Sequence, residues 1–250
     1  MKDLSKAVEF LFSKLKGKRA ARDYLRLKRV DRDLTNVKSG DLILDVGCGL
    51  ALDDFLYASK GVMCNCLDLH QESLKMAKSW ARYLKTENKM NFILGDALHL
   101  PFKDACFDAV VSYSAIEHLR CGYDKWIYEM ARVAREGGLV VLTTSNRSWF
   151  FYPIARLYSK IRIIDFEYFF HYDEITDLLE RNGLKIIAWD AEGLYVYHIF
   201  PESLYIGRIL NDLLHKLEEI CLRKFPCLRK ICGRFGFSCI KKSNGRKMNE

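Results

Sequence analysis

The sequence is poor in proline and contains no long uncharged apolar run. Only four of its 250 residues are proline. No stretch approaches the roughly 18 uncharged apolar residues that a membrane-spanning helix needs. Charged residues at positions 2, 3, 6 and 9 precede the short apolar stretch 10–12, so the uncharged core of a secretory signal is missing. We therefore expect neither a membrane span nor a secretory signal.

The nine cysteines form no C-x-x-C pair, and their number is odd. Unpaired thiols at irregular spacing are typical of a reducing compartment, so we expect a cytoplasmic chain. Four cysteines lie close together, at positions 221, 227, 232 and 239. The gaps of 5, 4 and 6 residues between them match no common zinc motif, so no metal site is predicted.

Composition and charge describe a globular chain with two basic ends. Half of the residues are hydrophobic and 29% are charged, which is ordinary for a soluble domain, and the length suits one α/β domain. The net charge is +8, with +7 in residues 1–40 and +7 in residues 206–250, which leaves −6 for residues 41–205. Basic ends favour nucleic acid or an anionic membrane as partners, and solvated surface without a partner is the alternative.

An alternation of apolar strands and helices begins at residue 41. Continuous apolar strands separated by helices indicate a parallel sheet that is covered on both faces, so the predicted fold class is α/β. We expect strands over residues 42–46, 62–68, 91–94, 107–113, 139–144, 184–189 and 235–240. We expect helices over residues 51–60, 72–85, 123–135 and 173–182, and an amphipathic helix over 203–224.

A glycine pair follows the first predicted strand. Asp45 closes the strand, and Gly47 and Gly49 lead into the next helix. A nicotinamide fingerprint, G-x-G-x-x-G/A, requires a small residue where Leu52 stands, so that interpretation is disfavoured. Asp68 and Asp96 end the next two strands. Three acids at neighbouring strand ends would repel a diphosphate, whereas they suit a nucleoside with a cationic amino-acid tail.

Several segments carry a family resemblance: Asp45-Val46-Gly47-Cys48-Gly49, then residues 66–69, 95–102, 107–112, 117–119 and 132–138. In these segments the chain resembles the class I S-adenosylmethionine-dependent methyltransferases, in the branch of the ubiquinone- and menaquinone-biosynthesis (type 11) enzymes. The resemblance covers about residues 41–190 and extends loosely to 241. It implies a Rossmann-like, doubly wound, mostly parallel seven-stranded sheet whose last strand is antiparallel. It also implies S-adenosylmethionine as cofactor.

The chain departs from the family pattern at two places. Leu50 and the pair Asp53-Asp54 are untypical of the glycine loop, and Glu136-Gly137-Gly138 replaces the usual Pro-Gly-Gly before the fifth strand. Neither departure removes a residue with an essential contact in the family.

The resemblance assigns cofactor roles to nine residues. Gly47 and Gly49 would let the methionine tail pass, with Asp45 near its ammonium group. Asp68 would hold the ribose, and Asp96 would read the adenine edge. The alternative for each acid is a helix N-cap or a solvated loop end. The predicted cofactor-binding residues are Asp45, Gly47, Cys48, Gly49, Asp68, Leu69, Asp96, Ala97 and Ser112.

Direct displacement at a sulfonium depends mainly on positioning, and it needs a base only if the acceptor loses a proton. His118, which follows the fourth strand, is the first candidate for that base, and Glu117 is the second. A histidine that only packs within its loop is the alternative reading of His118.

The expected acceptor side is the aromatic segment 145–172, in which ten of the 24 residues from Trp149 to Tyr172 are aromatic. Aromatic side chains suit a flat or lipid-like acceptor, whereas a second hydrophobic cluster is the alternative. We predict one methyltransferase domain over residues 1–250. It comprises an N-terminal helical cap (1–40), a cofactor-binding core (41–144), the aromatic segment, a C-terminal half (173–242) and a tail (243–250).

The predicted function is methyl transfer to oxygen or carbon of a small apolar, aromatic or isoprenoid molecule. Two alternatives stay open: an RNA-modifying methyltransferase, and a non-catalytic scaffold or partner subunit. Residues 112–115 read Ser-Tyr-Ser-Ala, which disfavours one known arrangement for methylating a base amine. The basic ends and the amphipathic helix leave peripheral membrane contact open, and the oligomeric state is not predicted.

Overall fold

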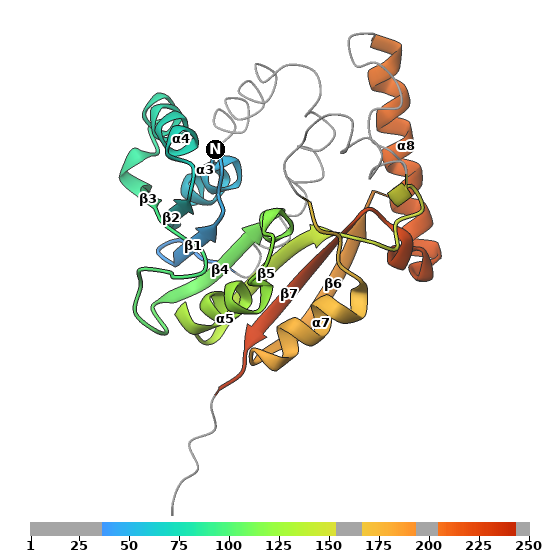
Figure 1. The fold of residues 1–250 in the computed structure, drawn as a ribbon. Helices are drawn as coiled ribbons and strands as arrows, with labels where there is room; N and C mark the ends of the chain where they lie inside the picture. Colours follow the sequence, from blue (N-terminus) through green and yellow to red (C-terminus); the bar gives the residue numbers. More distant parts are fainter. Residues whose placement is uncertain (1–36, 154–166, 194–204, 244–250) are drawn as a thin grey trace, which may run out of the picture.

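A seven-stranded sheet with helices on both faces forms the fold in the computed structural model, which describes residues 37–153, 167–193 and 205–243 (Figure 1). The strands are β1 (Leu42–Val46), β2 (Met63–Asp68), β3 (Met90–Leu94), β4 (Phe107–Tyr113), β5 (Ala134–Ser145), β6 (Leu184–Glu192) and β7 (Arg234–Lys241). The helices are α3 (Leu52–Ser59), α4 (Gln71–Tyr83), α5 (Tyr123–Val133), α7 (Tyr172–Arg181) and α8 (Tyr205–Lys224). Three short 3-10 turns are η2 (Glu87–Lys89), η3 (Ile116–His118) and η4 (Pro226–Ile231).

The strand order is β3-β2-β1-β4-β5-β7-β6. Strands β1 to β5 pair in parallel, and β7 lies antiparallel between β5 and β6. The predicted α/β fold with an antiparallel last strand is therefore confirmed. The order reverses between β1 and β4, and the crevice beyond the carboxyl ends of the strands at such a point is where ligands bind in open α/β sheets.

Alternating strand residues build two cores, one on each face of the sheet. On one face Leu44 and Val110 pack with residues of α5 and α7 such as Ile127 and Ile175. On the other face Ile43 packs with residues of α3 and α4. Because both faces are covered, the parallel strands read as continuous apolar runs in the sequence.

Strand β5 begins earlier than the sequence predicts. Ala134 already pairs with Phe107, and the regular register resumes only with Leu139 opposite Ala109. Gly137 lies between them with a positive φ of 70°, a conformation that glycine adopts without steric cost. Residues 134 and 135, which were expected to end the helix, and residues 136–138, which were expected to form a loop, therefore form an irregular extension of the strand.

Parts of the predicted subdivision lie outside the described residues. These parts are most of the N-terminal cap (1–36), residues 154–166 of the aromatic segment, and the tail from 244 onward. The division into cap, core, aromatic segment and C-terminal half stays a prediction. Within the described ranges, no helix is long and apolar enough to cross a membrane.

A buried ion pair fastens α5 to the loop that follows β3. The Arg132 guanidinium donates to Glu129 at 2.7 Å and to the carbonyls of Leu100 and Phe102. Glu129 also accepts the Leu100 N–H at 2.9 Å and pairs with Lys125. Burial alone would raise the pKa of Glu129, but these hydrogen bonds lower it to about 2. The network fixes the loop that begins with the predicted adenine contacts.

Replacing Glu129 by glutamine should destabilise the fold at neutral pH and remove part of its acid sensitivity. A carboxyl group whose pKa is lower in the folded than in the unfolded protein stabilises the fold when the pH is above the unfolded pKa. That stabilisation is lost as the pH falls from the unfolded pKa through the folded pKa. The window from about 4.5 down to about 2 corresponds to about 3 kcal/mol. Urea unfolding at pH 7 and pH 4 measures the difference between the two proteins. Glu72→Gln, which breaks an exposed pair with Lys75, is the control and should change little.

Candidate functional site

The glycine loop turns sharply between β1 and α3. The N–H groups of Gly47 and Cys48 both donate to the Leu67 carbonyl, at 2.8 and 3.0 Å. Gly47, Gly49 and Ala51 all have positive φ values, of 76°, 55° and 54°. These positive φ values let the loop pack against the end of β2, and Ala51 is the N-cap of α3.

The two glycines are required for different reasons. A Cβ atom on Gly47 would meet the Cβ of Ala115 at 2.5 Å, so the loop packs too closely there for a side chain. A Cβ atom on Gly49 would meet nothing within 4 Å. Gly49 therefore borders open space, and a ligand lying there could contact its backbone directly.

Asp68 closes the loop from the end of β2. Its Oδ2 accepts the Gly49 N–H at 2.7 Å, and its Oδ1 accepts the His70 N–H at 2.7 Å. Each carboxylate oxygen keeps a second lone pair for a ligand hydroxyl. Leu69, directly after it, is 70% exposed although it is apolar. The predicted ribose and adenine contacts thus lie side by side at one strand end.

Asp45 is buried beneath the loop, and its Oδ1 has no hydrogen-bond partner. Burial and the neighbouring carboxylate of Asp54 raise the pKa of Asp45 well above its usual range. Asp53 and Asp54 belong to the first turn of α3 and are buried too. A cation beside Asp45 would favour its ionised form, and the ammonium contact of Asp45 stays a prediction.

The predicted adenine residues lie beyond the end of β3. Asp96 is exposed, its Oδ1 accepts the Leu98 N–H at 2.8 Å, and its Oδ2 lies 3.5 Å from His99 Nδ1. Ala97 is buried. Asp96 thus stabilises its own loop, as the structural alternative expected, while its side chain stays accessible to a ligand.

Two predicted residues present no side chain to the crevice. The Ser112 hydroxyl is fully buried and donates to the Val46 carbonyl at 2.8 Å, so it holds β4 to β1. The Cys48 side chain is also buried, and it lies beside Cys66 of β2. Any cofactor contact of these two residues has to come from the backbone.

Glu117 and His118 form the turn η3 after β4, and they differ in burial. Glu117 is 1% exposed and its Oε2 has no hydrogen-bond partner, whereas His118 is exposed. Burial raises the pKa of Glu117, and the charges of Arg234 and His118 oppose that rise. Glu117, the second candidate from the sequence, therefore has the more perturbed environment of the two.

The surroundings of Glu117 come from distant parts of the chain and were missed by the sequence analysis. The Tyr168 N–H donates to the Glu117 carbonyl at 2.7 Å. Ser145, at the end of β5, donates its hydroxyl to Glu167 at 2.7 Å. Arg234 pairs with Ser145 in the register of β7 with β5. No sequence signal links these positions, because only the sheet order brings them together.

The described aromatic residues of segment 145–172 divide into two groups. Phe169 and Phe170 are buried, and Tyr168 packs on Phe170 with ring centroids 4.8 Å apart. Phe170 belongs to the core on the face of α5 and α7, and Tyr168 packs against that core. Phe150, in contrast, is among the most exposed large apolar side chains, and it packs edge-on against Phe151 at 5.1 Å.

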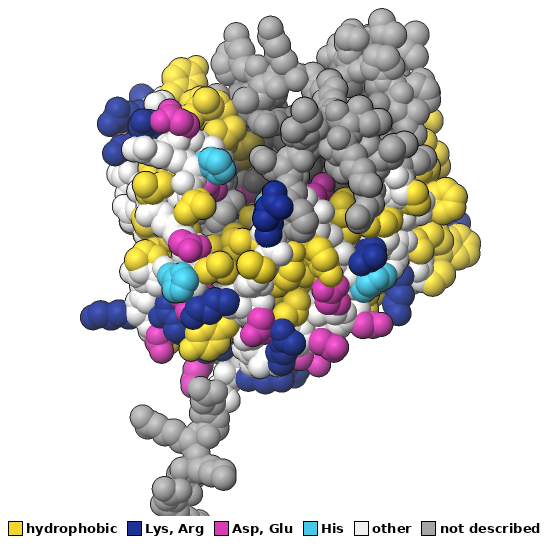
Figure 2. All heavy atoms as spheres, viewed as in Figure 1, with side chains coloured by type: hydrophobic (Ala, Val, Ile, Leu, Met, Phe, Trp, Pro, Cys, Tyr) yellow, Lys and Arg dark blue, Asp and Glu magenta, His cyan; other side chains and the backbone are white. Residues whose placement is uncertain are grey.

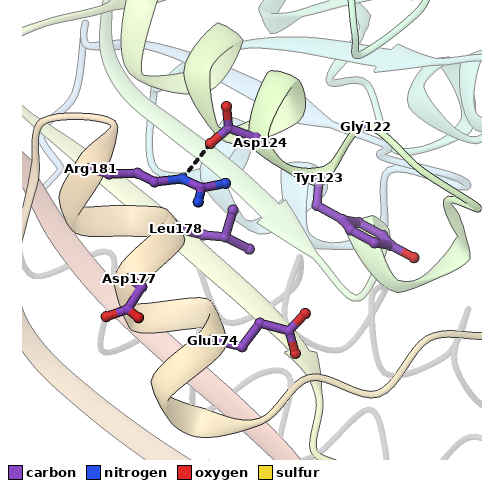
Figure 3. A pocket seen from close by; sticks show the side chains of 7 residues that line it. All are labelled: Gly122, Tyr123, Asp124, Glu174, Asp177, Leu178 and Arg181. Carbon is purple, nitrogen blue, oxygen red and sulfur yellow. Dashed lines mark hydrogen bonds and ion pairs between the residues drawn. The ribbon is translucent and has the colours of Figure 1, made fainter.

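A separate hollow of about 420 Å³ lies between α5 and α7 (Figure 3). Asp124 and Arg181 form an ion pair of 2.7 Å across it, and Glu174 accepts the Tyr168 hydroxyl at 2.9 Å. Its lining includes none of the predicted cofactor or catalytic residues: it is formed by Gly122, Tyr123, Asp124, Glu174, Asp177, Leu178 and Arg181.

Together these residues fit a nucleoside that carries a cationic amino-acid tail. The open side of Gly49 offers room for the tail, and the unpartnered Asp45 oxygen offers a partner for its positive charge. Asp68 and the exposed Leu69 offer a carboxylate for the ribose and an apolar surface for the base.

Comparison with known proteins points to one family. Residues 44–142 match the family described as a methyltransferase domain, of type 11. Norajmaline N-methyltransferase of Rauvolfia serpentina is 38% identical over 108 residues, which are 42% of this chain and 37% of that protein. The chain thus spans little more than a third of that relative's length.

Among the solved structures that share the fold are two with S-adenosyl-L-methionine bound. Phosphoethanolamine N-methyltransferase 2 of Haemonchus contortus, in complex with S-adenosyl-L-methionine, has a TM-score of 0.63 at 19% identity, over 88% of this chain and 53% of that one. A geranyl diphosphate methyltransferase in complex with the same molecule has a TM-score of 0.60 at 14% identity, over 87% of this chain and 84% of that one. The family match falls on the strands and loops that carry the site, so residues 44–142 are similar to the type 11 methyltransferase domain, and two of the structures that share the fold hold S-adenosylmethionine.

Proposed function

We propose that this chain transfers a methyl group from S-adenosylmethionine to oxygen or carbon of a small apolar, aromatic or isoprenoid molecule. Glu117 carries the proposal, because it is a buried carboxyl group with an unpartnered oxygen in the turn η3, which follows β4. The end of that strand adjoins the crevice between β1 and β4, where the cofactor is expected. A buried group without a hydrogen-bond partner is costly, and such groups concentrate at functional sites.

The proposed binding residues act by positioning. Bound S-adenosylmethionine supplies a methyl group that is already activated. Asp68 holds the ribose hydroxyls, Asp45 faces the ammonium group, and the backbone at Gly49 allows close approach of the tail. Fixing donor and acceptor in one geometry lowers the barrier by avoiding the entropy cost of their encounter.

Glu117 and His118 are the proposed proton-handling residues. An acceptor hydroxyl must lose its proton during transfer, and the unpartnered Glu117 Oε2 can accept a hydrogen bond from it. His118 is adjacent and exposed, so its ring can pass the proton on to solvent. The raised pKa of Glu117 brings this carboxyl closer to the working range of a general base.

The acceptor class rests on the apolar surroundings and on the relatives. Phe150 and Phe151 supply aromatic surface in the segment after β5. The relatives named above act, by their names, on norajmaline, phosphoethanolamine and geranyl diphosphate. Two of them are N-methyltransferases, so a screen for acceptors has to include amines beside phenols and isoprenoids.

The alternatives from the sequence stay predictions. The hypothesis of an RNA substrate rests on the basic ends of the chain. Residues 1–36 and 244–250 of those ends lie outside the described residues. A scaffold role would be favoured by loss of Gly47, Gly49 or Asp68, but all three are present. Transfer to RNA should weaken steeply as salt rises, whereas transfer to an apolar acceptor should barely respond. The cytoplasmic location is a prediction of the same kind.

Glu117→Gln should lower methyl transfer and raise stability at the same time. The loss of rate should be about a hundredfold or more if Glu117 is the base. Because the folded pKa of Glu117 is raised, its ionised form costs stability at neutral pH, and the amide removes that cost. The gain should vanish as the pH falls below the unfolded value of about 4.5. Transfer of labelled methyl to the acceptor panel and urea unfolding measure the two effects.

Glu218→Gln is the matched control, because Glu218 is also a buried glutamate but belongs to α8. Its Oε1 accepts the Gly193 N–H, with a distance of 2.7 Å between the two atoms. This variant should leave the transfer rate unchanged. A Glu117→Gln protein that transfers methyl at the wild-type rate would remove Glu117 from the mechanism.

A further inference from the structure

Helix α8 has an apolar face that turns away from the rest of the domain. Leu213, Leu217 and Ile220 are 52%, 48% and 47% exposed. Their spacing of four and three residues places them in one row along the helix. The opposite side of the helix is the one that packs on the domain, because Glu218 and Leu222 are buried.

Two more exposed apolar side chains follow the helix in the sequence. Phe225 is 57% exposed and Ile231 is exposed as well. We call Leu213, Leu217, Ile220, Phe225 and Ile231 the α8 strip. Figure 2 shows hydrophobic side chains gathered at the edge of the molecule where α8 lies in Figure 1, with Lys and Arg side chains beside them. Apolar side chains that are adjacent in this way, rather than scattered singly, indicate an interaction surface.

Basic residues accompany the strip. Residues 213–231 contain five Lys and Arg residues against two glutamates, and Glu218, one of the two, is buried. Arg229 lies 3.7 Å from Asp190, and Lys230 lies over the Tyr172 ring. Among the described side chains, Lys216, Arg223 and Lys224 are exposed along the helix, and Lys230 is exposed after it. An apolar row bordered by exposed cations is the pattern of a helix that lies on an anionic membrane surface.

We propose that the α8 strip docks on an anionic lipid surface, with its apolar side chains in the interface and Lys216, Arg223 and Lys224 against the headgroups. A second copy of the chain fits less well, because two such strips would bring cations of the same sign together. Five side chains are also few beside the roughly 20–30 residues that each partner gives to a stable interface. The docking is independent of the proposed methyl transfer, although it would suit a lipid-like acceptor.

Sedimentation of the full-length chain with lipid vesicles tests the docking. We expect binding to vesicles of phosphatidylcholine with phosphatidylserine, at least tenfold weaker binding to phosphatidylcholine alone, and weaker binding as salt rises. The variant L213Q/L217Q/I220Q should lose binding at least tenfold. Met76 and Tyr83 of α4 are also exposed, so M76Q/Y83Q is the matched control and should bind as wild type does.

Three results would overturn the docking: no binding of wild type to anionic vesicles, equal binding of the α8 variant, or equal loss in the α4 control. Size-exclusion chromatography adds a fourth. A wild-type dimer that the α8 variant converts to a monomer would assign the strip to self-association instead. Titration of the same proteins with S-adenosylmethionine separates this outcome from failure of the proposed function, because the α8 variant should bind the cofactor normally.

Discussion

Replacing Asp68 by alanine is expected to weaken S-adenosylmethionine binding at least tenfold, or by about 1.4 kcal/mol. The substitution removes the carboxylate that is positioned for the ribose hydroxyls. It also removes the acceptor that orients the Gly49 N–H at 2.7 Å and the His70 N–H at 2.7 Å. Hydrogen bonds to a charged group contribute about 1.5–3 kcal/mol each, so a tenfold loss is a conservative expectation. Calorimetric titration of both proteins measures it.

Asp108→Ala is the matched control for this loss. Asp108 also accepts a backbone N–H, that of Leu42 at 2.7 Å, and it pairs with Arg135. Asp108 lies near the amino end of β4, whereas Asp68 lies at the carboxyl end of β2. The Asp108→Ala substitution should therefore lower the stability of the fold without changing the affinity for the cofactor. Equal affinity losses in the two variants would mean that Asp68 acts only through the stability of the fold.

Replacing Gly49 by asparagine is expected to lower the affinity for S-adenosylmethionine at least tenfold while leaving the fold intact. Gly49 has a φ of 55°, and asparagine tolerates this left-handed region better than most residues. Nothing lies within 4 Å of a Cβ atom placed there. The new side chain therefore occupies the space in which the cofactor tail is expected, rather than clashing with protein. Titration with the cofactor measures the loss, and thermal unfolding measures the cost in strain.

Gly137→Asn is the control that separates backbone strain from blocking of the cofactor site. Gly137 also has a positive φ, of 70°, and also borders open space, but it lies in the irregular start of β5. Both variants should lose similar stability, and only Gly49→Asn should lose affinity. A Gly49→Asn protein that binds the cofactor as tightly as wild type would place the tail elsewhere.

The central strands of the sheet were predictable because β1, β2 and β4 are buried on both faces. Residues 42–46 and 107–113 are mostly apolar segments, and their predicted bounds agree with the structure. The three acids Asp45, Asp68 and Asp96 were predictable as a group because parallel strands bring their carboxyl ends to one edge. What each acid bonds to was not predictable, since the Asp68 contacts depend on the conformation of Gly49.

Other features depend on contacts that sequence patterns do not encode. Glu117 is buried and His118 is exposed, and the Tyr168 N–H, from a distant part of the chain, bonds to the Glu117 carbonyl. The Ser112 hydroxyl bonds to β1 because of the β1–β4 register. Helix α8 was predictable from its amphipathic pattern, but only the packed fold shows that Leu213 and Leu217 stay exposed.

The most direct test of the account is calorimetric titration of the wild-type chain with S-adenosylmethionine and S-adenosylhomocysteine. The account predicts one site with micromolar affinity for both molecules, because the glycine loop, Asp45 and Asp68 meet parts that both molecules share. Absence of binding to the folded protein would contradict the cofactor site and, with it, the proposed methyl transfer.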